Sequence, residues 1–237
     1  MGNASLNIPA RFNGPPTSGN GGYSCGVLAA YVDGPARVRL LVPPPLDTQL
    51  QVTVHEDGRV DMFDDETLVG TGTPCQLALE VPAAPTLEQA QKARERYACY
   101  HDHVFDTCFV CGPGRPAHDG LELFPGPVDN WQLIACSWQP APDLLDEQGL
   151  IRHEILWSAL DCPGYFAAMG ENIRPAVLGE LDGELLAPVA GSEPLIVYAW
   201  PMGEDGRKLY AGTAIARPDG TVVACSRSTW ILLKSPD

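Results

Sequence analysis

The hydrophobic pattern in the first half of the chain predicts one helix followed by several strands. Residues 19–34 are rich in glycine and small apolar residues and predict a helix with Asn20 as its N-cap and an end at Gly34. Strand-like runs of apolar and β-branched residues then follow, at 36–42, 50–55, 59–63 and 68–81.

The second half of the chain repeats this order. Apolar residues recur at helical spacing over residues 151–169 and predict a second long helix. Two strands are expected before this helix, at 121–124 and 131–138, and four after it, at 177–187, 195–201, 208–216 and 222–233. Between the halves, a proline-rich stretch leads into a polar segment, 87–97, that predicts a connecting helix.

A short turn motif that occurs twice supports an internal repeat. The tetrapeptide Glu-Asp-Gly-Arg is a hairpin-turn signal and occurs at residues 56–59 and again at 204–207. Each copy lies between the second and third strands after its helix, which indicates a divergent internal duplication. We therefore predict two halves, 1–86 and 105–237, joined by a connecting segment, 87–104.

Packing requirements then favour an α+β architecture. A sheet wrapped around a helix hides the apolar helix, and two such sheets joined edge to edge cover their open edge strands. The expected structure has two antiparallel sheets, each wrapped around a long central helix and joined into one continuous sheet.

Composition and charge exclude some classes of binding partner and indicate a location. The chain has 237 residues, and its 15 Lys and Arg against 30 Asp and Glu give a formal net charge of −15. Such a surface repels phosphate backbones and anionic lipid, so we expect no nucleic-acid partner and no membrane partner. The start of the chain shows no secretory signal, and the eight cysteines are scattered, so we expect reduced thiols and a cytoplasmic location. A homo-oligomer is compatible with the sequence, which does not fix the oligomeric state.

Three motifs carry a family resemblance. They are Cys108-Phe-Val-Cys-Gly-Pro113, Gly120-Leu-Glu-Leu-Phe124 and Trp157-Ser-Ala-Leu-Asp-Cys-Pro-Gly164. Together they resemble the thioesterase superfamily of hotdog proteins, more narrowly PaaI-like and acyl-CoA thioesterase-like members, here in the tandem, double-hotdog form. The resemblance covers most of the second half, and the first half mainly through Gly19-Asn-Gly-Gly-Tyr23.

This resemblance implies an acyl-thioester hydrolase acting on acyl-CoA or an acyl-carrier-protein conjugate. It assigns Gly21 and Gly22 to the start of a central helix, where backbone N–H groups and the helix dipole can stabilise an oxyanion. Asp161 matches the family's acidic residue and would activate water or attack directly. Asn20 stands where the family often has His, and its amide can still donate a hydrogen bond.

The same resemblance predicts that only one of two equivalent sites works. His153 stands where the family has Gly at the second helix start, and Ala29 and Ala30 stand where the first helix should carry its acid. The remaining candidates for substrate binding are Tyr23, His153, Glu154 and Trp157. The simpler interpretation is structural: His153 and Glu154 lie in the first turn of the predicted helix, and Tyr23 and Trp157 are aromatic residues of the core or of a pocket wall. Asp161 also has a structural alternative, in which its carboxylate bonds only to nearby backbone groups. Gly21 and Gly22 could likewise be a flexible turn that leads into the helix.

Coenzyme A enters this hypothesis as part of the substrate, and no tightly held cofactor is expected. Its phosphates need basic residues, for which Arg115, Arg152 and the segment 92–96 are candidates. Two rival functions remain open: a non-catalytic acyl- or CoA-binding hotdog protein, and a hotdog dehydratase or hydratase. The second ranks lower because it needs a His paired with a carboxylate across the helices, whereas His153 and Asp161 share one predicted helix.

A cluster of metal-binding residue types lies between the halves. Cys108 and Cys111 form a Cys-x-x-Cys pair, and His103 with either Cys99 or His101 could complete a tetrahedral zinc site. A second Cys-x-x-Cys pair is missing from the sequence, and a redox dithiol is a further alternative. A tight turn with buried thiols is the preferred interpretation, so no metal site is expected.

Overall fold

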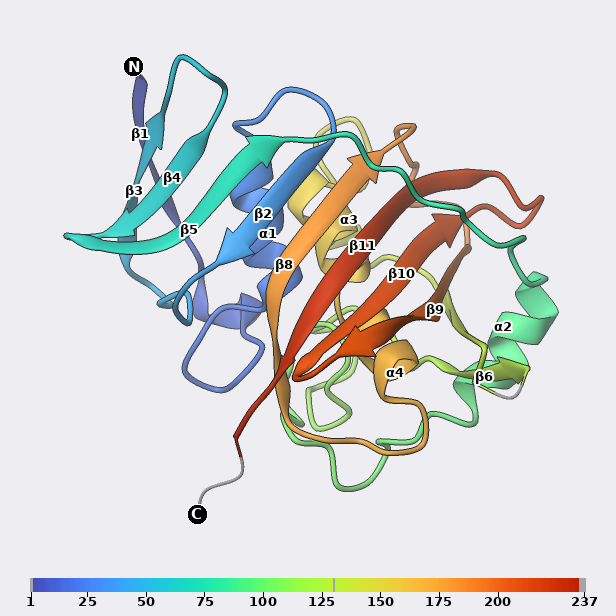
Figure 1. Ribbon diagram of the computed structural model, residues 1–237. Helices are drawn as coiled ribbons and strands as arrows, with labels where there is room; N and C mark the ends of the chain where they lie inside the picture. The colour runs from blue at the N-terminus through green and yellow to red at the C-terminus, as the bar shows by residue number, and fades with distance from the viewer. Residues whose placement is uncertain (1, 130, 235–237) are drawn as a thin grey trace.

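One antiparallel sheet of eleven strands dominates the computed structural model, which describes residues 2–129 and 131–234 (Figure 1). The strand order is β1-β3-β4-β5-β2-β8-β11-β10-β9-β7-β6. The first-half elements are β1 (Gly2–Asn7), α1 (Gly21–Ala29), β2 (Ala36–Leu40), β3 (Gln49–Val54), β4 (Val60–Asp64) and β5 (Thr67–Pro74). A short helix, α2 (Leu87–Arg94), follows.

The second half continues the same sheet. Its elements are β6 (Gly126–Asp129), β7 (Leu133–Trp138), α3 (His153–Ala159), α4 (Cys162–Met169), β8 (Ala176–Leu185), β9 (Leu195–Asp205), β10 (Lys208–Ala216) and β11 (Val222–Leu232). Two 3-10 turns, Ala10–Phe12 and Pro142–Leu144, complete the described elements. In each half the last four strands follow one order, β3-β4-β5-β2 and β9-β10-β11-β8, and β2 and β8 pair where the halves meet.

The junction between the halves is held by charged side chains as well as by backbone pairing. Arg37 on β2 lies opposite Asp182 on β8 and donates from Nε and Nη2 to its two carboxylate oxygens, at 2.8 and 2.7 Å. Arg39 donates from Nε to Glu180, its register partner. A two-donor guanidinium–carboxylate pair fixes orientation as well as distance, so the register of the two half-sheets is specified at this edge.

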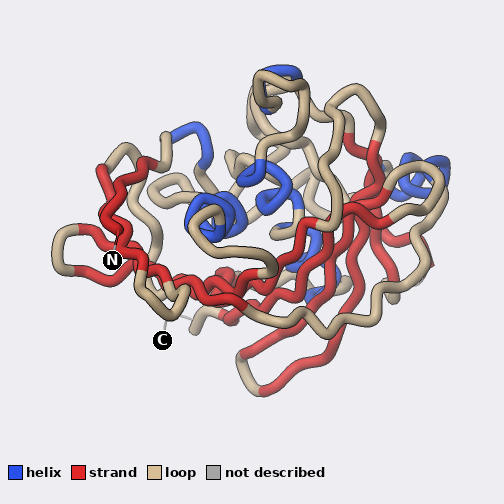
Figure 2. The backbone as a smooth tube through the Cα atoms, turned by 90° about the horizontal axis from the view of Figure 1, so that it is seen from above, coloured by secondary structure: helices blue, strands red, loops and turns tan. Residues whose placement is uncertain are grey.

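The curved sheet has helices on both faces, with different roles. Figure 2 shows most of the helical turns gathered on one side of the curve, where α1, α3 and α4 lie over the main core. α2 packs on the other face through Ala90, against Ile196, Tyr198 and Trp200 of β9. The intervening β9 residues, such as Val197, belong to the main core, which explains why this strand is apolar at consecutive positions.

Most predicted elements are present, and both hairpin turns fall where the repeated tetrapeptide placed them. Gly58 and Gly206 adopt positive φ angles of 82° and 58° between β3 and β4 and between β9 and β10. The first-half helix is shorter than predicted, because it ends at Ala29 instead of Gly34. β1 was not predicted, and the predicted strand 68–81 ends at Pro74.

Two sequence predictions are wrong for identifiable reasons. Residues 121–124 form no strand, because the N–H groups of Leu121 and Leu123 donate to the carbonyls of Phe109 and Val110 in an irregular loop. The expected helix 151–169 is interrupted at Asp161, whose backbone angles (φ −88°, ψ −87°) are not helical, and it restarts as α4 with Pro163 in its first turn. Within the described residues, no helix combines the length and the apolar character that crossing a membrane requires.

Candidate active site

The break between α3 and α4 presents the carboxylate of Asp161 to the start of α1. The side chain is 1% exposed, and its Oδ2 accepts hydrogen bonds from Gly22 N–H at 2.8 Å and from Asn20 Nδ2 at 2.9 Å. The structure therefore brings three of the sequence-predicted residues together, with the carboxylate supplied by one half and the helix start by the other.

Burial dominates the acidity of Asp161. Loss of solvent raises its pKa to about 7, although the hydrogen bonds from Gly22 and Asn20 work in the opposite direction. The second oxygen, Oδ1, is buried and has no hydrogen-bond partner among the described residues. A buried oxygen without a partner is costly for folding, which makes this carboxylate a candidate for chemistry.

Asn20 links the helix start to its surroundings. Its Oδ1 accepts from Tyr23 N–H at 2.9 Å and caps α1, as the sequence predicts. Its Nδ2 donates to Asp161 and lies 3.9 and 3.8 Å from the sulfurs of Cys108 and Cys162. One buried amide thus contacts the helix, the carboxylate and two thiols.

The glycines of α1 permit an unusually close approach of the second half. A Cβ at Gly22 would lie 2.5 Å from Asp161 Cβ and 2.6 Å from the carbonyl oxygen of Trp157, and Gly26 is similarly close to Glu154 and Trp157. Because Gly22 N–H is bonded to Asp161, the remaining donor is Gly21 N–H, which heads the helix and has no intrahelical partner. Gly21 also lines the adjoining cavity.

A cavity of about 220 Å3 opens at the N-terminal end of α1. Asn20, Gly21 and Asp161 line its polar side, and its apolar walls come from the loop after β2, the start of β8 and α4. It lies beyond the helix start and not between α1 and α3, which the glycine contacts hold together. Such a cavity suits an apolar chain that ends in a polar group at Asp161.

Four other candidates lie outside the cavity lining within the described part of the chain. Tyr23 is buried and stacks on Phe12 with ring centroids 4.0 Å apart. Trp157 is 2% exposed, and the imidazole of His153 stacks on its indole at 6.0 Å. Glu154 pairs with Arg152 at 3.4 Å. All four residues therefore lie in the core or at a helix start, which is the simpler interpretation that the sequence allowed.

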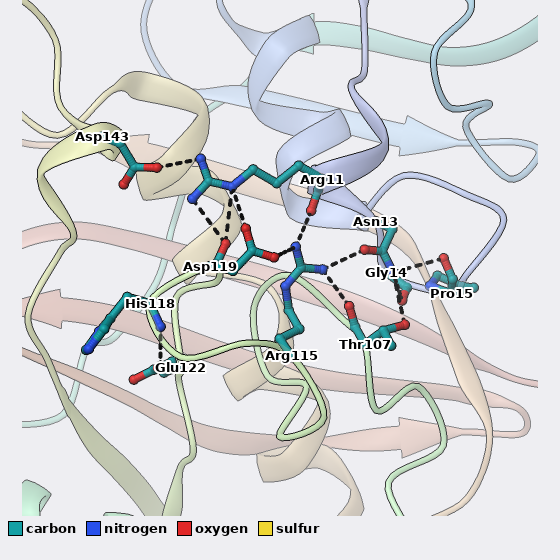
Figure 3. A network of polar contacts seen from close by, with 10 residues as sticks. All are labelled: Arg11, Asn13, Gly14, Pro15, Thr107, Arg115, His118, Asp119, Glu122 and Asp143. Carbon is teal, nitrogen blue, oxygen red and sulfur yellow. Dashed lines mark hydrogen bonds and ion pairs between the residues drawn. The ribbon is translucent and has the colours of Figure 1, made fainter.

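The candidate basic residues all have protein partners. Arg115 is 9% exposed and donates to Asn13, to the carbonyls of Arg11 and Thr107, and to Asp119 at 2.6–2.9 Å (Figure 3). Figure 3 shows this network joining the loop before α1 to the loop after Thr107. Arg115 therefore holds together two segments beside the cavity. Lys92 pairs with Glu88, Arg94 with Glu122, and Arg96 donates to the carbonyl of Pro127.

Sequence reasoning missed a group of three thiols beside this site. The sulfurs of Cys108, Cys111 and Cys162 lie within 4.8 Å of one another, and all three side chains are buried. Hydrogen bonds from Cys111 and Cys162 lower the pKa of Cys108 well below its usual value, whereas burial raises the pKa of Cys111. The only sequence signal was the Cys-x-x-Cys pair, because Cys162 belongs to a distant motif.

Comparison with known proteins supports the fold. No protein-family model matches the chain, and the comparison with curated proteins gave no match. Among solved structures, the chain is similar to the tesB protein of Mycobacterium avium subspecies paratuberculosis, with a TM-score of 0.64 and 12% identity over 98% of this chain and 93% of that chain.

Two further solved structures agree. A hot dog fold protein of unknown function from Alicyclobacillus acidocaldarius gives a TM-score of 0.64 at 10% identity over 99% of this chain and 94% of that chain. An acyl-CoA thioesterase II, TesB2, from Mycobacterium marinum gives 0.58 at 12% identity over 86% and 82%. At such identities the likeness shows the fold, and it confirms the predicted resemblance to hotdog-fold thioesterases over nearly the whole chain.

Proposed function

We propose that the protein hydrolyses an acyl thioester, with acyl-CoA or an acyl-carrier-protein conjugate as the substrate class. The observation that carries the proposal is the buried carboxylate of Asp161, held by the start of α1 at the wall of an apolar cavity. The shared fold with an acyl-CoA thioesterase of Mycobacterium marinum supports the same class of reaction.

In this mechanism the acyl chain occupies the cavity and the thioester carbonyl faces the N-terminus of α1. Gly21 N–H and the positive end of the helix dipole stabilise the oxyanion as it develops. Asp161 takes a proton from water through Oδ1, and the oxygen of that water attacks the carbonyl carbon. The carbon–sulfur bond then breaks, and the proton passes from Asp161 to the departing thiolate.

The hydrogen bonds of Asp161 lead us to propose other roles for two residues than the family resemblance implied. Gly22 N–H and the Asn20 amide position Asp161 instead of binding the carbonyl, because both already donate to Oδ2. One oxyanion donor thus remains where two were expected. This observation favours the second candidate function, a protein that binds acyl thioesters without hydrolysing them.

The test is a panel of acyl-CoA substrates assayed for release of free thiol, with Asp161→Asn compared with the unmodified chain. The substitution keeps the size of the side chain and removes the base, so we expect turnover to fall by about 10²–10⁴-fold. Glu204→Gln, on the exposed β9–β10 hairpin, is the matched control and should keep full activity.

The two candidate functions give different results in this assay. Unchanged turnover in Asp161→Asn would contradict the catalytic role of this carboxylate. Tight binding of acyl-CoA in calorimetry, without thiol release at any chain length, would establish the non-catalytic alternative.

A further inference from the structure

Three buried cysteines from two distant parts of the chain meet at the wall of the cavity. Cys108 and Cys111 come from the loop between α2 and β6 and Cys162 from the first turn of α4, and they are 3–7% exposed. Their sulfurs lie within 4.8 Å of one another. Three sulfurs cannot all pair as disulfides, so oxidation does not account for the whole group.

Two of the distances match the edges of a metal-centred tetrahedron. Zinc–sulfur bonds of about 2.3 Å at tetrahedral angles place neighbouring sulfurs about 3.8 Å apart, and a zinc–nitrogen bond of about 2.0 Å places the nitrogen about 3.5 Å from each sulfur. The sulfurs of Cys108 and Cys162 are 3.8 Å apart, and Nε2 of His103 lies 3.4 Å from the sulfur of Cys111.

We propose that Cys108, Cys111 and Cys162 bind a zinc ion as thiolates and that His103 supplies the fourth ligand through Nε2. The proposal departs from the expectation of a turn with buried thiols, and it replaces Cys99 and His101 of the sequence-based zinc alternative with Cys162. Four protein ligands of this kind form a closed, structural type of site.

When zinc binds, the three thiols release their protons to solvent and become thiolates, and the histidine stays neutral. Phe105 N–H donates to Nδ1 of His103 at 2.9 Å, which places the imidazole proton on Nε2. Ligation through Nε2 moves that proton to Nδ1, so the Phe105 N–H must turn to another acceptor. His103 is therefore the ligand that must adjust most, whereas the three sulfurs already face one another.

The surroundings of the sulfurs are those that thiolate ligands require. The Asn20 amide donates toward the sulfurs of Cys108 and Cys162, at 3.9 and 3.8 Å. Hydrogen-bond donors of this kind orient metal ligands and offset their negative charge. The residue after the pair must be Gly112, since a Cβ there would lie 2.3 Å from the carbonyl oxygen of Asp106.

The position of the site gives it a role in the architecture. A zinc ion would join the loop that contains Cys108 and Cys111 to the first turn of α4, directly after Asp161. Because the Asn20 amide contacts both Asp161 and two of the sulfurs, the ion would also fix the carboxylate against the start of α1. The proposal does not depend on the proposed hydrolase activity, and its tests measure the metal itself.

The first test measures the metal content of the full chain, purified without chelators and without a polyhistidine tag. Inductively coupled plasma mass spectrometry should find about one zinc per chain, and Cys111→Ser and Cys162→Ser should each lower this at least about tenfold. Cys136→Ser and Cys225→Ser are matched controls, because both thiols are buried on the sheet, away from the cluster. Their zinc content should equal that of the unmodified chain.

The second test uses the unmodified chain, so it stands even if the cysteine variants do not fold. Replacement of zinc by Co²⁺ should give the intense visible absorption of a tetrahedral site together with sulfur-to-cobalt charge transfer, and His103→Ala should alter the visible bands. Absence of zinc together with failure to take up Zn²⁺ or Co²⁺ would overturn the proposal. So would a stoichiometric iron content, full zinc retention in Cys162→Ser, or a Cys108–Cys162 disulfide found by mass spectrometry.

Discussion

The starts of α1 and α3 occupy corresponding places in the two halves and differ in chemistry. At α1, Asn20 caps the helix and two glycines leave the backbone open to the carboxylate of Asp161. At α3, the N-cap Arg152 makes no side-chain capping bond, and His153 occupies the first helical position, which is Gly21 in α1. The same fold therefore contains one helix start that is open to a carboxylate and one that is filled by side chains.

At α1 the absence of a side chain lets the helix start meet a carboxylate. Gly22 lets Asp161 approach so closely that its N–H donates directly to the carboxylate. His153 instead stacks on Trp157, and Nε2 of its ring is buried without a partner among the described residues. The first half offers no equivalent acid, because Ala29 and Ala30 stand where one would be needed.

The largest expected effect on stability comes from closing the gap at Gly22. In Gly22→Ala the new methyl group collides with Asp161 Cβ and with the backbone carbonyl of Trp157, neither of which can move alone. Overpacking of this kind costs about 1–3 kcal/mol or more, which exceeds the gain of about 1 kcal/mol from better helix propensity. Urea unfolding should show a lower free energy of unfolding.

The matched variant at the other helix start is His153→Ala. It removes a ring whose Nε2 has no partner, so its loss of stability should be smaller than that of Gly22→Ala. Equal losses in the two variants would mean that the close approach at Gly22 is not what distinguishes the two helix starts.

A smaller effect is expected from Asn20→Ala. The variant loses the N-cap bond to Tyr23 N–H and one of the two donors to Asp161, and loss of an N-cap typically costs about 0.5–2 kcal/mol. Thermal unfolding followed by circular dichroism measures the change.

Asn20→Ser separates the two contributions, because serine keeps a capping oxygen and lacks the amide donor. We expect it to recover part of the stability and none of the amide hydrogen bond to Asp161. If serine were no more stable than alanine, the N-cap would contribute little to α1.

The smallest effect is expected from Arg152→Ala, the N-cap of α3. Its side chain makes no capping bond, forms a partly exposed ion pair with Glu154 at 3.4 Å and lies over the ring of Phe12 at 6.0 Å from the centroid. Such pairs contribute about 0–1 kcal/mol, so the free energy of unfolding in urea should fall by less than in Asn20→Ala. A loss as large as that of Asn20→Ala would show that the two helix starts depend equally on their N-cap residues.

The sequence predicted the features that depend on neighbouring residues. Asn20 precedes a glycine pair and caps α1, and the repeated Glu-Asp-Gly-Arg turns lie in the hairpins that they predict. Asp161 could be selected because it is an acid inside an apolar run, in a motif with a family resemblance. The sequence also separated the two helix starts, because glycine and histidine differ whatever the fold.

Only the tertiary structure decided which of these residues meet. Asn20 and Asp161 are 141 positions apart, and Cys108 and Cys162 are 54 apart, so no local pattern shows their contacts. The helix break at Asp161 turns its carboxylate toward α1, and the tight packing at Gly22 and Gly26 places the cavity at the helix start instead of between the helices. Local sequence fixes hydrogen bonds within a turn or a cap, whereas close packing of the two halves against one sheet decides which buried polar groups and thiols become neighbours.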